Sequence, residues 1–189
     1  HTQAAWFFLR CAQTIMVWWL SGACAPVLLG QENQTARFRT YADGPLTPRD
    51  YQAEVPENRG ELDAFTTTDL RFNYQYRTYR SSRRVRAWTT KVDVFAVVLP
   101  DRSWNRRPDD KQLLDHEQGH FDLAHIAAMQ AQRHFDKSGR LSGVASDENR
   151  AIAEMRRQVE QQLQVFVDDL RVANEQYDAM TRHGRIRDA

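Results

Sequence analysis

The sequence predicts an α+β fold in which a small antiparallel β-meander is followed by two long helices. Three observations predict it: residues 69–79 alternate between apolar and polar side chains, two further strand-like runs follow, and the last third of the chain repeats apolar residues every three or four positions. Alternation is typical of a half-buried strand, and three-and-four spacing is typical of an amphipathic helix. We therefore expect a sheet first and helices packed on it.

Composition favours one domain, expected over residues 31–189. The 189-residue chain is 41% hydrophobic, which is enough for a sizeable core. Its net charge of +1 gives no global field that would indicate nucleic acid as a partner. Both cysteines, Cys11 and Cys24, precede the expected domain, which therefore has neither a disulfide nor a cysteine-ligated metal.

Residues 1–30 have the pattern of an export signal. Arg10 supplies a basic region, residues 15–20 form an apolar core, and small residues at 21–23 suit a cleavage site. We expect the protein to be exported to the periplasm or secreted. An uncleaved membrane anchor and lipidation of Cys24 remain alternatives, and the anchor would allow membrane association.

The next part of the chain predicts a lead-in and then the meander. Residues 31–66 are rich in turn-forming residues and show no sustained period, so we expect irregular structure there. Residues 69–79 are expected to form the first strand, because their apolar residues fall on one face. Strand-like runs at 85–90 and 92–99 should complete an antiparallel meander.

Helix signals follow the meander. The first helix is expected to begin at Pro108, which suits the first helical position, and to run to about residue 137, where Gly139 and Gly143 break it. Ser146 should cap the second helix. The apolar stripe of that helix predicts a face packed on the sheet and the first helix: Ile152, Met155, Val159, Leu163, Phe166, Leu170, Ala173, Tyr177 and Met180.

The first helix contains an HExxH pattern formed by His116, Glu117 and His120. Residues four apart share a helix face, so both imidazoles can reach one ion. Glu117 lies about 100° further round the helix, where it can reach a water beside that ion. Two ligands and a general base on one helical turn are the pattern of a zinc hydrolase. A di-iron bundle would need a second Glu-x-x-His, which the sequence lacks.

A catalytic zinc needs a third protein ligand. His125 follows His116 by nine residues, which on a straight helix turns it about 180° away. His183 continues the apolar stripe of the second helix, and Gly184 suits a helix end, so His183 projects toward the first helix. Glutamates of the second helix remain alternatives: Glu148 and Glu154.

Other residues could assist the chemistry expected from this motif. A zinc-activated water would attack a carbonyl, with Glu117 as general base. Tyr177 could stabilise the resulting oxyanion, but it also continues the apolar stripe, so a core role is the alternative. Asp122 or Asp178 could orient a ligand imidazole.

Several stretches resemble an uncharacterised bacterial family of predicted secreted zinc-dependent proteases, domain of unknown function 922. The resemblance runs over about residues 40–186 and rests on four stretches: LTPRDYQAEVP (46–56), Ser103-Trp104, LLDHEQGHFD (113–122) and YDAMTRHG (177–184).

The resemblance implies an HExxH metallohydrolase with His116 and His120 as ligands and Glu117 as base. It also marks His183 as a motif residue, which favours His183 as the third ligand. Such sequences often carry an acidic residue where this chain has His125, so any role of that residue is altered here. The family's activity is itself a prediction and implies no substrate.

We expect an exported Zn²⁺-dependent metallopeptidase that acts on a peptide or protein substrate. A hydrolase of another amide or ester and a metal-containing binding module without turnover are the alternatives. Arginines and aromatic residues interleave at 76–88, a pattern that can bind single-stranded nucleic acid, but a solvated hairpin end is the expected structure and no nucleic acid is expected.

Overall fold

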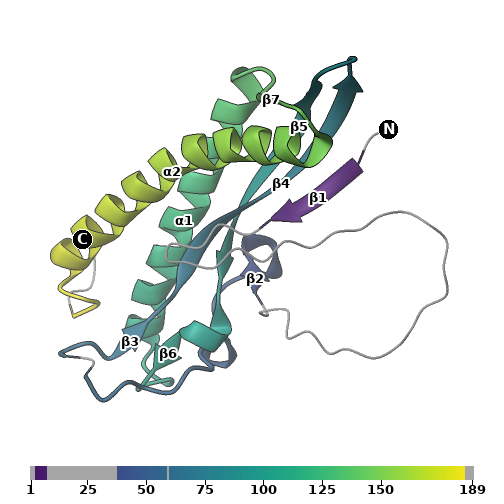
Figure 1. Cartoon of the computed structure of the whole chain (residues 1–189). Coiled ribbons are helices and arrows are strands. Elements are labelled where there is room, and N and C mark those ends of the chain that lie inside the picture. Colours follow the sequence, from purple (N-terminus) through teal and green to yellow (C-terminus); the bar gives the residue numbers. More distant parts are fainter. Residues whose placement is uncertain (1–2, 8–37, 59, 186–189) are drawn as a thin grey trace, which may run out of the picture.

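The computed structural model describes residues 3–7, 38–58 and 60–185 of the chain. It confirms the predicted α+β fold: an antiparallel sheet carries two long helices on one face (Figure 1). Apart from residues 3–7, the expected export segment lies outside the described residues. Among the described residues, no helix has the length and apolar character needed to cross a membrane.

The main sheet has five antiparallel strands. Strands β1, β4, β5 and β2 follow one another in that order, and β7 also pairs with β5. Their bounds are Gln3–Phe7 (β1), Arg39–Thr40 (β2), Thr68–Arg80 (β4), Val85–Val98 (β5) and Ser142–Ala145 (β7). A separate two-stranded sheet joins β3 to β6, with bounds Ala64–Phe65 (β3) and Trp104–Asn105 (β6).

The sheet is larger and more continuous than the predicted meander. The break expected near residue 91 does not occur, because a register shift between Gln75 and Tyr76 absorbs the change of pattern and β5 continues through Lys91. Strand β7 was missed, since its four residues alternate too briefly to reveal a strand. Part of the lead-in expected to be irregular also forms β2, β3 and two short 3-10 helices, Tyr41–Asp43 and Pro48–Asp50.

Both helices begin at aspartate caps that the sequence analysis did not select. Helix α1 spans Lys111–Lys137, and the Asp110 carboxylate accepts a hydrogen bond from the Leu113 N–H at 3.1 Å, so the start expected at Pro108 was wrong. Helix α2 spans Glu148–Thr181 and is capped by Asp147 instead of Ser146. A carboxylate that accepts an N–H bond also interacts favourably with the positive end of the helix dipole.

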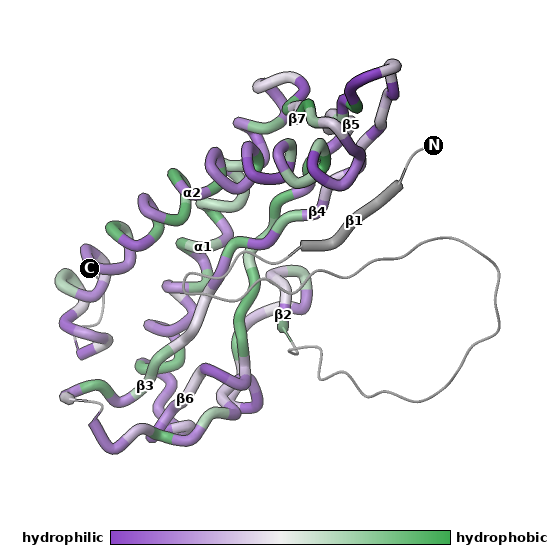
Figure 2. The backbone as a smooth tube through the Cα atoms, in the orientation of Figure 1, coloured by the Kyte–Doolittle hydropathy of each residue, from purple (hydrophilic) through white to green (hydrophobic). Residues whose placement is uncertain are grey.

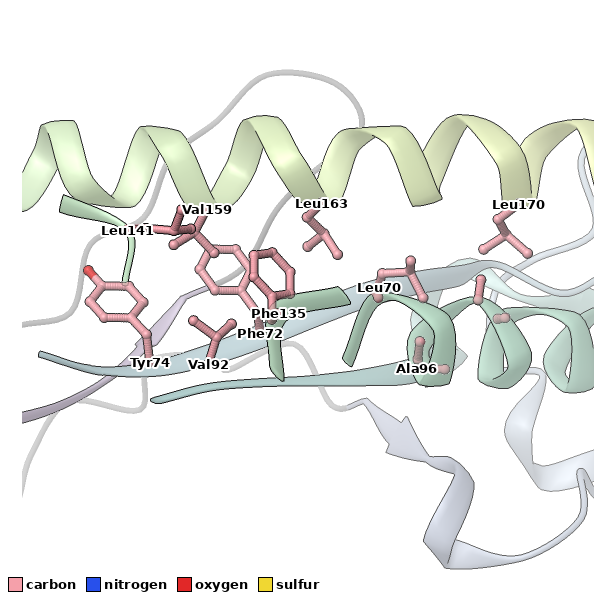
Figure 3. Packing of buried hydrophobic residues seen from close by; sticks show 14 of the residues in the cluster. Leu70, Phe72, Tyr74, Val92, Ala96, Phe135, Leu141, Val159, Leu163 and Leu170 are labelled. Carbon is pink, nitrogen blue, oxygen red and sulfur yellow. The ribbon is translucent and has the colours of Figure 1, made fainter. Parts of the chain in front are cut away.

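The core lies between the sheet and the helices. Leu70 pairs with Ala96 and Phe72 with Val94 across β4 and β5, and these side chains share the face that the helices cover. Figure 3 shows Leu163 and Leu170 of α2 pointing toward this face. Along the tube in Figure 2, hydrophobic segments of β4 and β5 run beneath the helices.

The packing brings the start of α1 and the end of α2 together beside β3, at one end of the molecule (Figure 1). The turn between β4 and β5 lies at the opposite end. Five exposed arginines gather there: Arg77, Arg80, Arg83, Arg84 and Arg86. The HExxH segment near the start of α1 and the arginine cluster are therefore far apart.

Strand β7 crosses α2 so closely that only glycine fits at position 143. A Cβ on Gly143 would lie 2.2 Å from the Ala151 carbonyl oxygen and 2.5 Å from the Met155 nitrogen. We expect Gly143→Ala to lower the free energy of unfolding by about 2 kcal/mol, since the backbone must move apart. Urea unfolding followed by circular dichroism measures this, and Val144→Ala at an exposed position of the same strand is the control. Equal stability of the two variants would contradict the close crossing.

Candidate metal centre

Two histidines of α1 and an aspartate of α2 form the centre of the candidate site. The Nε2 atoms of His116 and His120 lie 3.2 Å and 3.1 Å from Oδ1 of Asp178. One potential ligand atom from each of the three residues falls within 4.8 Å of the others. His116 is buried, and His120 and Asp178 are partly buried. The three side chains could therefore hold a metal ion.

Thr181 fixes the tautomer of His116. Its hydroxyl donates to the Tyr177 carbonyl at 2.7 Å, which uses the only proton of that group. The same oxygen lies 3.2 Å from Nδ1 of His116, so it must accept a hydrogen bond from that nitrogen. Burial and the neighbouring His120 lower the pKa of His116 to about 4, so the ring is neutral at pH 7. Nε2 then carries a lone pair directed at Asp178.

Asn174 has the same effect on His120. The Oδ1 atom of Asn174 lies 2.9 Å from Nδ1 of His120 and accepts its proton. The Nε2 atom of His120 is left with a lone pair, which also faces Oδ1 of Asp178. Hydrogen bonds at the far ring nitrogen are the usual way in which proteins orient metal-binding imidazoles.

The consequence is that two imidazole lone pairs and a carboxylate oxygen converge on one point. Acceptor atoms this close repel one another, and a cation between them removes that repulsion. Ligand atoms around a tetrahedral zinc lie about 3.3 Å apart, given zinc–ligand bonds of about 2.0–2.1 Å. The separations of 3.1 Å and 3.2 Å between the histidine nitrogens and the Asp178 oxygen match that spacing. The donor set therefore fits a divalent metal ion.

His183 lies at the rim of this cluster. Its Nδ1 atom is 3.4 Å from the same Asp178 oxygen, and its side chain is 52% exposed. The turn that carries it is strained, because Arg182 and His183 both have positive φ angles of 49° and 54°. Gly184 completes the turn at φ 76°, and its carbonyl accepts a hydrogen bond from Gln112. This hydrogen bond and the one that the His183 N–H donates to the Asp178 carbonyl at 3.0 Å hold His183 beside the other histidines.

Tyr177 packs against the cluster instead of lining the cleft. Its ring stacks on His116 with centroids 5.0 Å apart and meets His120 edge-on at 5.2 Å. The hydroxyl lies over Gly119, where a Cβ would come within 2.2 Å of it. This contact explains why glycine lies inside the HExxH segment. The geometry gives Tyr177 a packing role against both histidines, and its hydroxyl lies over Gly119.

Glu117 is buried beside the cluster with one oxygen unpaired. It is 3% exposed, and its Oε2 atom has no hydrogen-bond partner among the described residues. Burial raises the pKa of Glu117, while hydrogen bonds from the side chain and backbone of Thr66 oppose that rise. An unpaired buried oxygen is costly unless it has a further role. The arrangement suits a carboxylate that accepts and releases a proton.

A cleft of about 260 Å³ opens over these residues. One wall is the segment Leu62–Thr68, which includes β3, and the floor is α1. The other lining residues come from the helices and the turn after α2: Leu113, His116, Glu117, His120, Asn174, Asp178 and His183. The three residues of the HExxH pattern and His183 therefore meet in one cleft, as the sequence predicted they would.

The alternative ligands lie elsewhere. His125 stacks on Tyr41 with ring centroids 3.9 Å apart, on the side of α1 away from the cluster. Glu148 lies at the start of α2 near Thr78, and Glu154 forms an ion pair with Arg157. Asp122 accepts hydrogen bonds from Tyr41 and Gln118, so it does not orient a cluster histidine: Tyr41 at 3.0 Å and Gln118 at 2.7 Å.

The sequence analysis missed three residues of the site in the roles that the structure gives them. Asp178 was considered only for orienting a histidine, although its carboxylate is the group on which the histidines converge. Asn174 and Thr181 were not considered. These residues are spaced by four and three, so polar side chains on one face of the last helical turns were the available signal.

Comparison with known families gives one match. The family described as bacterial protein of unknown function (DUF922) matches residues 39–184, which include all the site residues described above. Comparisons with curated proteins and with solved structures give no match.

The hydrogen bond from His116 to Thr181 predicts a measurable tautomer. In ¹⁵N-labelled protein without added metal, we expect the His116 proton on Nδ1 at neutral pH. Thr181→Val keeps the side-chain shape but removes the acceptor, so the ring should populate the other tautomer, whereas Thr181→Ser should retain the Nδ1 proton. Imidazole ¹⁵N chemical shifts distinguish these forms. An Nε2 proton in the unsubstituted protein would contradict the assignment.

Proposed function

We propose that this chain, which belongs to the bacterial family of unknown function DUF922, is a zinc-dependent metallopeptidase. The observation that carries the proposal is the unpaired Oε2 atom of Glu117. It is buried beside the cluster formed by His116, His120 and Asp178. A structural metal site needs no such carboxylate, whereas hydrolysis needs a base beside the ion. We further propose that the protein acts in the periplasm or outside the cell, because of the signal-like pattern in residues 1–30.

Three residues would hold the zinc: His116, His120 and Asp178. This changes the expected third ligand from His183 to Asp178, because Asp178 is less exposed and its Oδ1 atom lies within 3.2 Å of both ring nitrogens of α1. When bound, zinc polarises the substrate carbonyl and lowers the pKa of a water molecule to about 7. His183, which is half exposed at the cleft, would then face the bound substrate and would not be a zinc ligand.

Glu117 would move the proton. Its Oε2 atom takes a proton from the attacking water and passes it to the nitrogen of the leaving amine. Thr66 keeps the carboxylate in position through its two hydrogen bonds to Glu117. Burial favours the protonated form, which helps the carboxyl group to hold the proton between the two transfers. Hydrolysis of another amide or an ester would use the same steps.

The position of His183 supports a second candidate function, a metal-containing binding module without turnover. Its Nδ1 atom lies 3.4 Å from Asp178, near enough for His183 to become a fourth protein ligand. Four protein ligands are typical of structural zinc sites. The number of ligands therefore separates the two candidates.

Zinc affinity tests the ligand set. Competition with a fluorescent chelator should show one zinc per chain, with affinity reduced at least 100-fold in Asp178→Ala and less than tenfold in His183→Ala, because only Asp178 is a ligand. Asp168→Ala, an exposed position on the same helix, is the control and should bind zinc normally. Equal losses in the two site variants would favour four protein ligands and the binding module.

Replacement of the base tests catalysis. Glu117→Gln preserves the shape of the side chain but cannot accept the proton, so we expect hydrolysis of a casein digest to fall by about 10²–10⁴-fold. Zinc content and the free energy of unfolding should not fall, since glutamine removes a buried ionisable group. Glu54→Gln makes the same change at an exposed position and should leave hydrolysis unchanged. Hydrolysis that persists in Glu117→Gln would contradict the proposed role.

A further inference from the structure

We infer that the cleft edge of β3 binds an extended peptide and selects an apolar side chain beside the metal centre. This inference rests on the proposed function and adds a substrate class to it. The features that carry it are the direction of the β3 backbone groups, the apolar residues of the cleft wall and the pairing of the one acidic residue in that wall.

The backbone direction follows from the pairing of β3 with β6. The Arg106 N–H donates to the Asp63 carbonyl, and the paired residues continue as Ala64 with Asn105 and Phe65 with Trp104. In an antiparallel pair, hydrogen-bonded positions alternate along the strand. Asp63 and Phe65 therefore direct their backbone groups at β6, and Ala64 directs its N–H and C=O away from β6.

Thr66 shows which way that second edge faces. It lies two residues after Ala64, so its backbone groups point to the same side. Its backbone N–H forms a hydrogen bond with Glu117. The N–H and C=O of Ala64 and the C=O of Thr66 therefore face the cleft above α1. Both residues line the cleft but are only 5% and 7% exposed, so a peptide must enter the cleft to reach these groups.

The cleft-facing edge consists of Ala64 and Thr66, and it ends beside Glu117, the proposed general base. A peptide segment paired with Ala64 would pass over Glu117 and the histidines of α1. Pairing of an extended peptide with an open strand edge fixes the direction of the peptide through backbone hydrogen bonds. The cleft thus favours polypeptide over a small amide or ester, which has no run of backbone groups to pair.

The side-chain preference follows from the walls. Phe65 is 49% exposed beside the cleft, and Leu62 and Leu113 complete an apolar lining. Leu113 precedes His116 by three residues on the same face of α1, so the apolar lining lies one helical turn from the metal centre. A large apolar side chain on the peptide would cover Phe65 and gain free energy from burial.

The charge of the wall is already neutralised. Asp63 lines the cleft, but its carboxylate forms ion pairs with Arg106 and Arg107. A lysine side chain on the peptide would find no free carboxylate on this wall, and an acidic side chain would have to compete with Asp63 for Arg106 and Arg107. The chemistry therefore favours an apolar residue over a charged one of either sign.

Binding to the inactive Glu117→Gln protein, loaded with zinc, tests the inference without turnover. Fluorescence polarisation is measured with labelled eight-residue peptides that carry Leu, Asp or Lys at one central position. We expect the Leu peptide to bind at least tenfold more tightly than the other two. Adding Phe65→Ser should weaken the Leu peptide about tenfold and leave the Asp peptide unchanged, while Val55→Ser, at another exposed apolar position, should change neither.

Backbone pairing is tested by N-methylation of single amides along the Leu peptide. Strand pairing predicts that methylation at the position opposite Ala64 abolishes binding and that methylation at each adjacent position is tolerated. Equal tolerance at all positions would overturn the pairing, and equal affinity for Leu, Asp and Lys peptides would overturn the side-chain preference.

The two proposals fail separately. If these peptides bind with the predicted pattern and the unsubstituted protein cleaves none of them, the peptide site stands and the metallopeptidase proposal fails. If the unsubstituted protein cleaves peptides and neither preference is found, the metallopeptidase proposal stands and the inference about β3 fails.

Discussion

The convergence of two imidazoles on the Asp178 carboxylate is the constraint around which this end of the molecule is organised. Each histidine donates its proton to a residue of α2, so the remaining ring nitrogens present lone pairs to a third acceptor. A cation bound between these atoms would stabilise that arrangement. The packing of α1 against α2 therefore forms part of the core and also brings together the side chains that could bind a metal.

This constraint explains why particular residues occupy most positions of the segment YDAMTRHG (177–184). Tyr177 packs against both imidazoles, Asp178 receives their lone pairs, and Thr181 sets the tautomer of His116. Gly184 adopts a positive φ and lies so near His116 that a Cβ would come within 2.9 Å of it. His183 is held in the same turn. The motif therefore belongs to one structure with HEQGH, in which Gly119 makes room for Tyr177.

Much of this could be predicted from periodicity. Alternation located β4, the three-and-four spacing located α2, and HExxH located the part of α1 that forms the cleft floor. The missed features depend on contacts between distant segments. Strand β7 is recognisable only from its pairing with β5, and the bulge at Thr90 of β5 shows only in the pairing of that strand with β4. Asp178 gained its role because α2 ends at Thr181, which turns His183 outward and leaves the aspartate facing α1.

The cleft combines two elements that sequence alone does not connect. Glu117 comes from the helix and Thr66 from the segment after β3, and the hydrogen bonds between them join the base to the wall that would hold the substrate. A change in that wall would therefore alter both the position of the base and the fit of a ligand.

The position of the metal ion is the most direct test of this account. Crystals of the protein grown with zinc should be measured with X-rays just above and just below the zinc absorption edge. We predict one anomalous peak among Nε2 of His116, Nε2 of His120 and the carboxylate of Asp178, with Oε2 of Glu117 facing it and not bound to it. A peak bound directly by Glu117, or no peak at this cluster, would contradict the account.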